Sequence, residues 1–173
     1  MSIEQLQAQI RNIPDYPKPG IIFRDITPLL ANPQALEKVV ELMATPFIGK
    51  GIKKVAAIEA RGFIFACAVA LKLNAGFVPI RKKGKLPWDT DFAEYELEYG
   101  TSAIEVHSDA FSAGESVIIV DDLLATGGTV GATLKLIERQ GAKVEGMSFL
   151  IELDALSGRD RFGGIPIFSI IHY

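Results

Sequence analysis

Cysteine and histidine are scarce in this chain, which has one cysteine and two histidines among 173 residues. A single cysteine, Cys67, excludes an internal disulfide. Because it stands in the apolar run 63–73, we expect it to be an inert core residue. His107 and His172 are not spaced as metal ligands with each other or with Cys67. The composition therefore gives little support to a disulfide scaffold or a zinc-type centre.

Excess positive charge and long hydrophobic runs are lacking as well. The formal net charge is −3, so no overall basic field attracts nucleic acid or an anionic membrane. No apolar run is long enough to span a bilayer. The N-terminal residues alternate between polar and apolar, unlike a signal peptide. We expect a cytoplasmic protein that binds neither nucleic acid nor membranes.

Two common nucleotide-binding motifs are also missing. The sequence has no G-x-x-x-x-G-K-[ST] and no G-x-G-x-x-G, and Gly49-Lys50 lacks a following hydroxyl residue. These absences argue against a Walker-type nucleoside triphosphatase and against a dinucleotide-binding fold.

Strand-like and helix-like segments alternate along a length that suits one domain, residues 1–173. This alternation predicts an α/β fold with a mostly parallel central sheet flanked by helices, whose ligands bind beyond the carboxyl ends of the strands. The polar connection 82–91 is a candidate mobile lid. The half-polar segments 94–98 and 102–107 suggest an antiparallel pair. Further predicted strands are 55–58, 77–80, 116–120, 143–151 and 166–172, and predicted helices are 2–11, 33–47, 62–73 and 129–140.

Two helix starts carry specific signals. Ser2 and Gln5 have the spacing of a capping box, and Asn32-Pro33 combines an N-cap residue with a proline in the first turn. The prolines between these helices predict an extended connection.

The most informative stretch is Val117 to Thr129, VIIVDDLLATGGT. Val117–Val120 predicts a strand buried on both faces, and Asp121 and Asp122 follow where that strand should end. Paired carboxylates there can hold vicinal hydroxyls or a hard cation such as Mg²⁺. The small residues that follow can wrap backbone N–H groups around a phosphate at the start of a helix. Together these features predict a binding site for a ribose 5-phosphate.

Two other loops carry weaker signals. Arg61 next to Gly62, at a predicted helix start, suits a second anionic group such as pyrophosphate, but it is equally compatible with a surface arginine. The loop 81–85 holds four cations, which could clamp a polyanion or form a solvated face.

Glu94, Glu96 and Glu98 alternate with apolar or aromatic residues, and one of them at the mouth of the site could act as a general acid or base.

These motifs match a known family. VIIVDDLLATGGT resembles the 5-phosphoribosyl-1-pyrophosphate (PRPP) signature of type I phosphoribosyltransferases. Four further motifs, in the same order along the chain, resemble the adenine-specific members of that family: PKPGIIFRDITPLL (17–30), EARGF (59–63), IRKKGKLP (80–87) and YELEYG (95–100). The resemblance runs from Ile10 to Tyr173.

The resemblance implies a reaction and an architecture. The 5-phosphoribosyl group of PRPP would pass to adenine with Mg²⁺, giving AMP and pyrophosphate. The fold would carry a small N-terminal hood, residues 1–34, that contributes to the base pocket, and a flexible β-hairpin lid. The segment 82–94 would fold over the reactants, and the protein would be a homodimer.

The resemblance also implies roles for individual residues. The ribose hydroxyls would bind to Asp121 and Asp122, directly or through Mg²⁺-bound water. In this family a peptide bond in the loop 59–62, called the pyrophosphate loop below, can be cis. Glu98 would be the catalytic acid/base, and Arg61 and Lys85 would stabilise the leaving group. The 5-phosphate would bind to Ala125, Thr126, Gly127, Gly128 and Thr129. The pyrophosphate would bind to Ala60, Arg61, Gly62, Arg81 and Lys85, the last two from the same or a neighbouring subunit.

Base choice would rest on Ile22 and Arg24, whose backbone carbonyl and N–H groups complement the N6 donor and N1 acceptor of adenine. Hypoxanthine and guanine present the reverse pair, which leaves the protein groups unpaired. Phe23 could line the pocket or pack into the core. The alternatives are a transferase for another base, or a PRPP-binding regulator that contacts nucleic acid. The short segment before Pro17 and the net charge disfavour the regulator.

Overall fold

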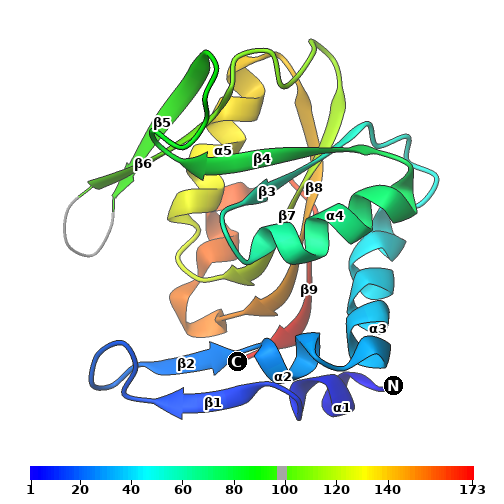
Figure 1. Ribbon diagram of the computed structural model, residues 1–173, viewed down its shortest axis with the longest axis vertical. Helices are drawn as coiled ribbons and strands as arrows, with labels where there is room; N and C mark the ends of the chain where they lie inside the picture. The colour runs from blue at the N-terminus through cyan, green and yellow to red at the C-terminus, as the bar shows by residue number, and fades with distance from the viewer. Residues whose placement is uncertain (97–100) are drawn as a thin grey trace.

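A seven-stranded sheet forms the centre of the computed structural model, which describes residues 1–96 and 101–173. The strand order is β5-β6-β4-β3-β7-β8-β9 (Figure 1). Neighbouring strands from β4 to β9 are parallel, whereas β6 is antiparallel to β4 and β5 is antiparallel to β6. This is the predicted α/β arrangement, with an antiparallel hairpin at one edge.

The strands are β1 (Arg11–Pro14), β2 (Ile22–Asp25), β3 (Lys54–Ile58), β4 (Gly76–Lys82), β5 (Thr90–Glu96), β6 (Thr101–His107), β7 (Ser116–Leu124), β8 (Lys143–Glu152) and β9 (Ile167–His172). The α-helices are α1 (Ile3–Gln7), α2 (Thr27–Leu30), α3 (Pro33–Ala44), α4 (Gly62–Leu73) and α5 (Gly128–Arg139). Short 3₁₀ helices are η1 (Thr45–Phe47), η2 (Asp154–Leu156) and η3 (Gly158–Phe162).

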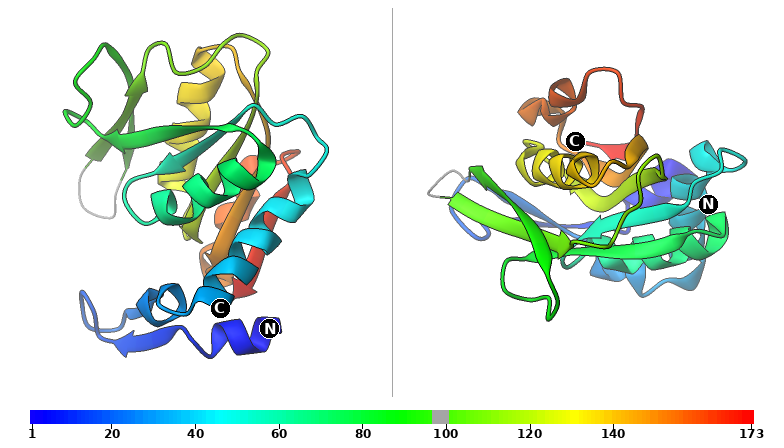
Figure 2. Two further views of the ribbon diagram at one scale, coloured as in Figure 1. Left: turned by 45° about the vertical axis from the view of Figure 1, so that its right-hand side comes forward. Right: turned by 90° about the horizontal axis from the view of Figure 1, so that it is seen from above.

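Two apolar cores, one on each face of the sheet, follow from the alternation of side chains along β7. Ile118 and Val120 pack with residues of α3 and α4, whereas Val117 and Ile119 pack with residues of α5. All four side chains are fully buried, as expected for a strand covered on both faces. Seen from above, α5 and α4 lie on opposite sides of the sheet (Figure 2).

The N-terminal residues form a separate layer. Strands β1 and β2 pair antiparallel in a sheet of their own, which lies at the end of the molecule toward which the arrowheads of β7, β8 and β9 point (Figure 1). The capping box of α1 is confirmed, because Ser2 and Gln5 exchange both hydrogen bonds. The start of α3 is also confirmed, since Asn32 accepts hydrogen bonds from the first turn.

Several boundaries differ from the predictions. Strand β7 continues through the acid pair to Leu124, because it stays paired with β8 as far as Leu124 opposite Glu152. Strand β5 begins at Thr90, so the end of the predicted lid segment belongs to a strand instead of a loop. Helix α1 is shorter than predicted, and the extended connection contains β1. The hairpin of the predicted lid is present as β5 and β6, and its flexibility stays a prediction.

The expectation for Cys67 is wrong. Cys67 is exposed because it lies on the outward face of α4, which it shares with the exposed side chains of Ile64 and Leu71. None of the helices in the described ranges is long and apolar enough to cross a membrane.

Candidate active site

The acid pair lies near the carboxyl end of the central strand. Asp122 is only 5% exposed, and the Nη2 atom of Arg61 lies 2.7 Å from its Oδ2 atom. This ion pair is not aligned as a hydrogen bond, so Oδ2 of Asp122 receives no hydrogen bond from the residues that the structure describes. Asp121 accepts a hydrogen bond from the backbone N–H of Asp122, at 2.9 Å. Asp122 is thus buried and Asp121 half-buried, and both have few hydrogen-bond donors.

The surroundings of the pair oppose its negative charge. Burial raises the pKa of Asp121 well above its ordinary value, and the charge of Asp122 raises this pKa further. Burial also raises the pKa of Asp122, while Arg61 and the hydrogen bond with Asp121 counteract part of that rise. Additional hydrogen-bond donors or a hard cation would compensate these carboxylates.

The predicted phosphate loop, residues 125–129, follows β7 and leads into α5. Gly127 has a φ of +78°, in the left-handed region that favours glycine, and helix α5 begins at the next residue. A Cβ atom on Gly127 would lie 3.0 Å from the carbonyl oxygen of Gly158 and from the ring of Phe162. The first-turn N–H groups of α5 have no partners within the helix, so they are available to a phosphate.

The loop between β3 and α4 approaches the acid pair closely. The peptide bond between Glu59 and Ala60 is cis, in agreement with the family pattern. A Cβ atom on Gly62 would lie 2.7 Å from Oδ1 of Asp121 and 3.1 Å from the carbonyl oxygen of Val120. Glycine at this position therefore lets the N-terminal turn of α4 pack directly against the end of β7.

A cavity of about 300 Å³ joins these loops. Its lining includes the β3–α4 loop, and the acid pair with two residues of the phosphate loop that follows it, so two segments far apart in the sequence meet there. The lining residues are Ile58, Glu59, Ala60, Arg61, Lys82, Tyr95, Ile104, Asp121, Asp122, Leu123, Ala125 and Thr129. Of the predicted phosphate-loop residues, Thr126 and Gly128 border a neighbouring groove of about 650 Å³ between β5 and α5.

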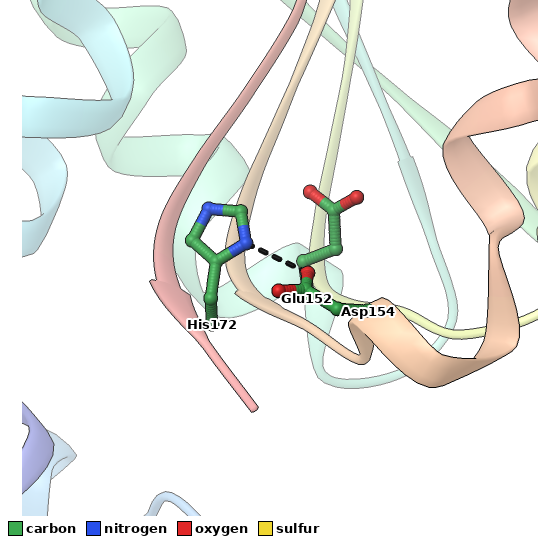
Figure 3. A group of neighbouring side chains, drawn as sticks. All are labelled: Glu152, Asp154 and His172. Carbon is green, nitrogen blue, oxygen red and sulfur yellow. Dashed lines mark hydrogen bonds and ion pairs between the residues drawn. The ribbon is translucent and has the colours of Figure 1, made fainter.

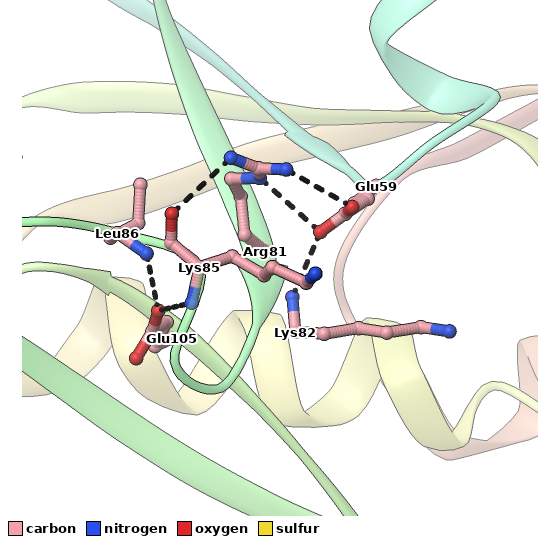
Figure 4. A network of polar contacts seen from close by, with 6 residues as sticks. All are labelled: Glu59, Arg81, Lys82, Lys85, Leu86 and Glu105. Carbon is pink, nitrogen blue, oxygen red and sulfur yellow. Dashed lines mark hydrogen bonds and ion pairs between the residues drawn. The ribbon is translucent and has the colours of Figure 1, made fainter.

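The predicted cations of loop 81–85 divide into two groups. Lys82 lines the cavity. Arg81 instead pairs with Glu59, with Nη2 and Oε1 3.2 Å apart, and donates from Nη1 to the carbonyl oxygen of Lys85 at 3.3 Å. Figure 4 shows these contacts. Arg81, Lys83 and Lys85 are not among the residues that line the cavity of their own chain.

The predicted base-binding residues lie together on β2. The side chain of Ile22 is 51% exposed. The ring of Phe23 packs edge-on against Tyr16, and the guanidinium of Arg61 lies 5.2 Å from the centre of that ring. The hood and the pyrophosphate loop are therefore in contact at Phe23.

The side chain of Arg24 is fixed from two sides. It donates from Nη1 to Oδ1 of Asn12 at 2.5 Å, and its guanidinium stacks 3.6 Å from the centre of the Tyr173 ring. Tyr173 was not predicted from the sequence. No local pattern marks it, because its partner lies at the opposite end of the chain.

The predicted acid/base Glu98 lies outside the described residues. Its neighbours on β5, Glu94 and Glu96, are exposed and border the groove beside α5.

A cluster that the sequence did not predict joins Glu152, Asp154 and His172 (Figure 3). Nδ1 of His172 lies 2.8 Å from Oδ1 of Asp154. Glu152 is already occupied by two donors from Arg159 and by the hydroxyl of Ser169. With its acidic oxygens satisfied and a histidine nitrogen included, this cluster suits Mg²⁺ less well than the acid pair does.

Known proteins match this chain over nearly its whole length. The model of the phosphoribosyl transferase domain matches residues 26–168. An adenine phosphoribosyltransferase of Rhodopirellula baltica is 56% identical over 168 residues, covering 97% of this chain and 82% of that protein.

Solved structures give the same result. The crystal structure of adenine phosphoribosyltransferase from Thermoanaerobacter pseudethanolicus has a TM-score of 0.96 and 48% identity, covering 99% of this chain and 100% of that one. The enzyme from Saccharomyces cerevisiae, in complex with adenine and an imino-altritol bisphosphate, has a TM-score of 0.92 and 37% identity, covering 97% of each chain. On this evidence the chain belongs to the phosphoribosyltransferase family, among its adenine phosphoribosyltransferases.

Proposed function

We propose that this chain transfers the 5-phosphoribosyl group of PRPP to adenine and releases AMP and pyrophosphate. The observation that carries this proposal is the cavity in which the acid pair, the start of the phosphate loop and the cis-peptide loop meet. Relatives at 56% and 48% identity are named adenine phosphoribosyltransferases, and the yeast structure contains adenine.

The two halves of PRPP would bind to different loops. Asp121 and Asp122 accept hydrogen bonds from the ribose hydroxyls, which supplies the donors that these buried oxygens need. The 5-phosphate binds to the N–H groups and hydroxyls of residues 125–129. The pyrophosphate binds to residues 60–62, where Arg61 stabilises the negative charge that develops on the leaving group.

The acid pair also fits Mg²⁺. Its oxygens are hard ligands, and Oδ2 of Asp122 is buried without a hydrogen-bond donor from the described residues. Mg²⁺ bound there would supply positive charge close to the pyrophosphate. Arg61, beside Asp122, holds the same carboxylate in place from the protein side.

The hood, residues 1–34, would complete the base pocket. Backbone groups of Ile22 and Arg24 select adenine by their donor and acceptor pattern, and Phe23 holds β2 against Arg61. Glu98 would manage the proton on N7 as N9 of adenine bonds to C1 of the ribose. The β5–β6 hairpin would close over the reactants and exclude water.

A homodimer would complete the pyrophosphate site. Ile64 and Leu71 are seven residues apart on α4, so they lie on one helix face, and they are 44% and 84% exposed. An apolar face of this kind is typical of a contact between subunits. Because Arg81 and Lys85 do not line their own cavity, we assign them to the pyrophosphate site of the partner subunit.

The test is a panel of bases. The purified protein is mixed with PRPP, Mg²⁺ and adenine, hypoxanthine, guanine, xanthine or orotate in turn, and mononucleotide formation is followed. We expect AMP from adenine and little product from the other bases. A reaction with hypoxanthine and none with adenine would contradict the assignment of Ile22 and Arg24.

A further inference from the structure

Glu105 is a buried carboxylate for which the proposed reaction has no role. It lies on β6, opposite Arg81 of β4 and Phe92 of β5, and is only 3% exposed. A carboxylate in such a position needs several hydrogen-bond donors.

The donors come from the loop between β4 and β5. The backbone N–H groups of Lys85 and Leu86 each donate to Oε1 of Glu105 at 2.8 Å, and the hydroxyl of Thr90 donates to Oε2 at 3.3 Å. Burial by itself would raise the pKa of Glu105, but the N–H groups of Gly84, Leu86 and Lys85 outweigh it, so this pKa lies below its ordinary value. Glu105 is therefore a charged group around which the loop is folded.

The loop is held on its other side by the pyrophosphate loop. The backbone N–H of Lys82 donates to Oε2 of Glu59 at 3.1 Å, and Arg81 donates to both carboxylate oxygens of Glu59 at 3.2 and 3.3 Å. Figure 4 shows Glu59 and Glu105 on either side of this basic segment. Arg81 also donates to the carbonyl oxygen of Lys85. One set of contacts therefore connects Glu105, through the backbone of Lys85 and through Arg81, to Glu59 of the pyrophosphate loop.

We propose that Glu105 is a positioning residue for the pyrophosphate half of the site. It fixes the turn 83–86, so that Lys82 faces the cavity of its own chain and the backbone of Lys85 is held where it meets Arg81. This inference rests on the proposed function and adds a residue that contacts neither substrate.

The test compares Glu105→Gln with wild type and with Glu37→Gln, a control at an exposed glutamate of α3. Glutamine can keep Oε1 as the acceptor for both N–H groups, but it removes the negative charge that strengthens these bonds. We expect the KM for PRPP and the inhibition constant of pyrophosphate to rise about tenfold, as for the weakening of two hydrogen bonds to a charged acceptor. The KM for adenine should stay within about twofold, because the base pocket keeps all its own groups.

A second readout needs no substrate. Trypsin cleaves after lysine and arginine, and the segment 81–85 holds four of them. Release of the turn in Glu105→Gln should accelerate cleavage there about tenfold relative to both comparison proteins, because limited proteolysis follows local opening. Should this variant fail to fold, Thr90→Val removes only the hydroxyl donor and should shift both readouts in the same direction by a smaller factor.

The outcomes separate the two proposals. If wild type forms no AMP, the proposed function fails. If wild type is active but Glu105→Gln keeps the wild-type KM for PRPP and the wild-type rate of cleavage, the positioning role is overturned. A variant whose KM values for PRPP and adenine rise equally would also overturn it, because that result indicates a general loss of structure.

Discussion

Two pairs of carboxylates near the candidate site differ in how many hydrogen-bond donors surround them and in the direction of their pKa shifts. Asp122 is buried and Asp121 is half-buried, both have few hydrogen-bond donors, and their pKa values are raised. Arg81 and the backbone N–H of Lys82 hold Glu59, backbone N–H groups of the β4–β5 loop hold Glu105, and the pKa values of both glutamates are lowered. The comparison distinguishes a carboxylate that is ready for a ligand from one that serves as scaffold.

The physical basis is the cost of burying charge. A buried carboxylate without donors destabilises the folded protein, and such sites persist where binding or catalysis uses them. The hydroxyls of a ribose, or a cation, would supply the missing partners of the acid pair. The glutamates already have their partners, so their contribution is to fix the loops between which the pyrophosphate would bind.

The largest expected effect is on PRPP binding. Replacing both acids, as Asp121→Asn with Asp122→Asn, removes the charge for Mg²⁺ and the strong acceptors for the ribose hydroxyls. We expect PRPP affinity to fall more than about a hundredfold, as for the loss of two hydrogen bonds to charged groups. Calorimetric titration with PRPP and Mg²⁺ measures it, with Asp109→Asn at an exposed position as the control. A PRPP affinity equal to that of wild type would contradict the assignment of Asp121 and Asp122 as the acids that bind the ligand.

A smaller effect is expected at Gly62. The added methyl group of Gly62→Ala would meet Oδ1 of Asp121 at 2.7 Å and a backbone oxygen at 3.1 Å, so the acid must move. We expect the KM for PRPP to rise about tenfold, because a misplaced acceptor loses about one hydrogen bond to the ribose. Gly76→Ala is a matched control, since its methyl group would meet nothing closer than 3.7 Å. Equal KM values for the two variants would show that the close approach at Gly62 is not needed.

The hood provides a third comparison, with a modest effect. Removing the ring in Tyr173→Ala frees the side chain of Arg24, whose guanidinium lies 3.6 Å from the ring centre. We expect the KM for adenine to rise about three- to fivefold, corresponding to one exposed cation–π contact, with the KM for PRPP unchanged. Tyr173→Phe keeps the ring and should behave as wild type. If Tyr173→Phe were as impaired as Tyr173→Ala, the ring contact could not be the cause.

Local patterns predicted much of the fold. The bounds of α4 agree with the prediction because glycine opens a continuous apolar run, and α3 begins at Pro33 because Asn32 caps it. The end of β7 was predicted too early. Aspartate disfavours a strand, yet pairing with β8 carries the strand through the acid pair to Leu124.

The candidate site could be predicted where its residues are contiguous in sequence. The acid pair and the phosphate loop form one motif. Its residues Asp121, Asp122, Ala125 and Thr129 line the cavity together with Ala60 and Arg61, whereas Thr126 and Gly128 border the neighbouring groove. Glu105 and Tyr173 were not predicted, because each acts through a partner far away along the chain. The outward position of Cys67 was also missed, since a uniformly apolar helix gives no sign of which face is covered.

Thermal unfolding at pH 7 tests the central comparison most directly. Asp121→Asn keeps the Oδ1 acceptor for the N–H of Asp122 but removes the buried charge, so its free energy of unfolding should exceed that of wild type. The pKa of Asp121 is higher in the folded protein than its ordinary value of 3.8 in the unfolded chain. As the pH falls through the folded-state pKa, the folded wild type takes up a proton and loses the unfavourable charge, so the advantage of Asp121→Asn should shrink. Glu105→Gln should instead lose about 1–3 kcal/mol at pH 7. A higher free energy of unfolding for Asp121→Asn together with a lower one for Glu105→Gln would support the distinction between the two pairs of carboxylates. Equal losses in both variants would contradict it.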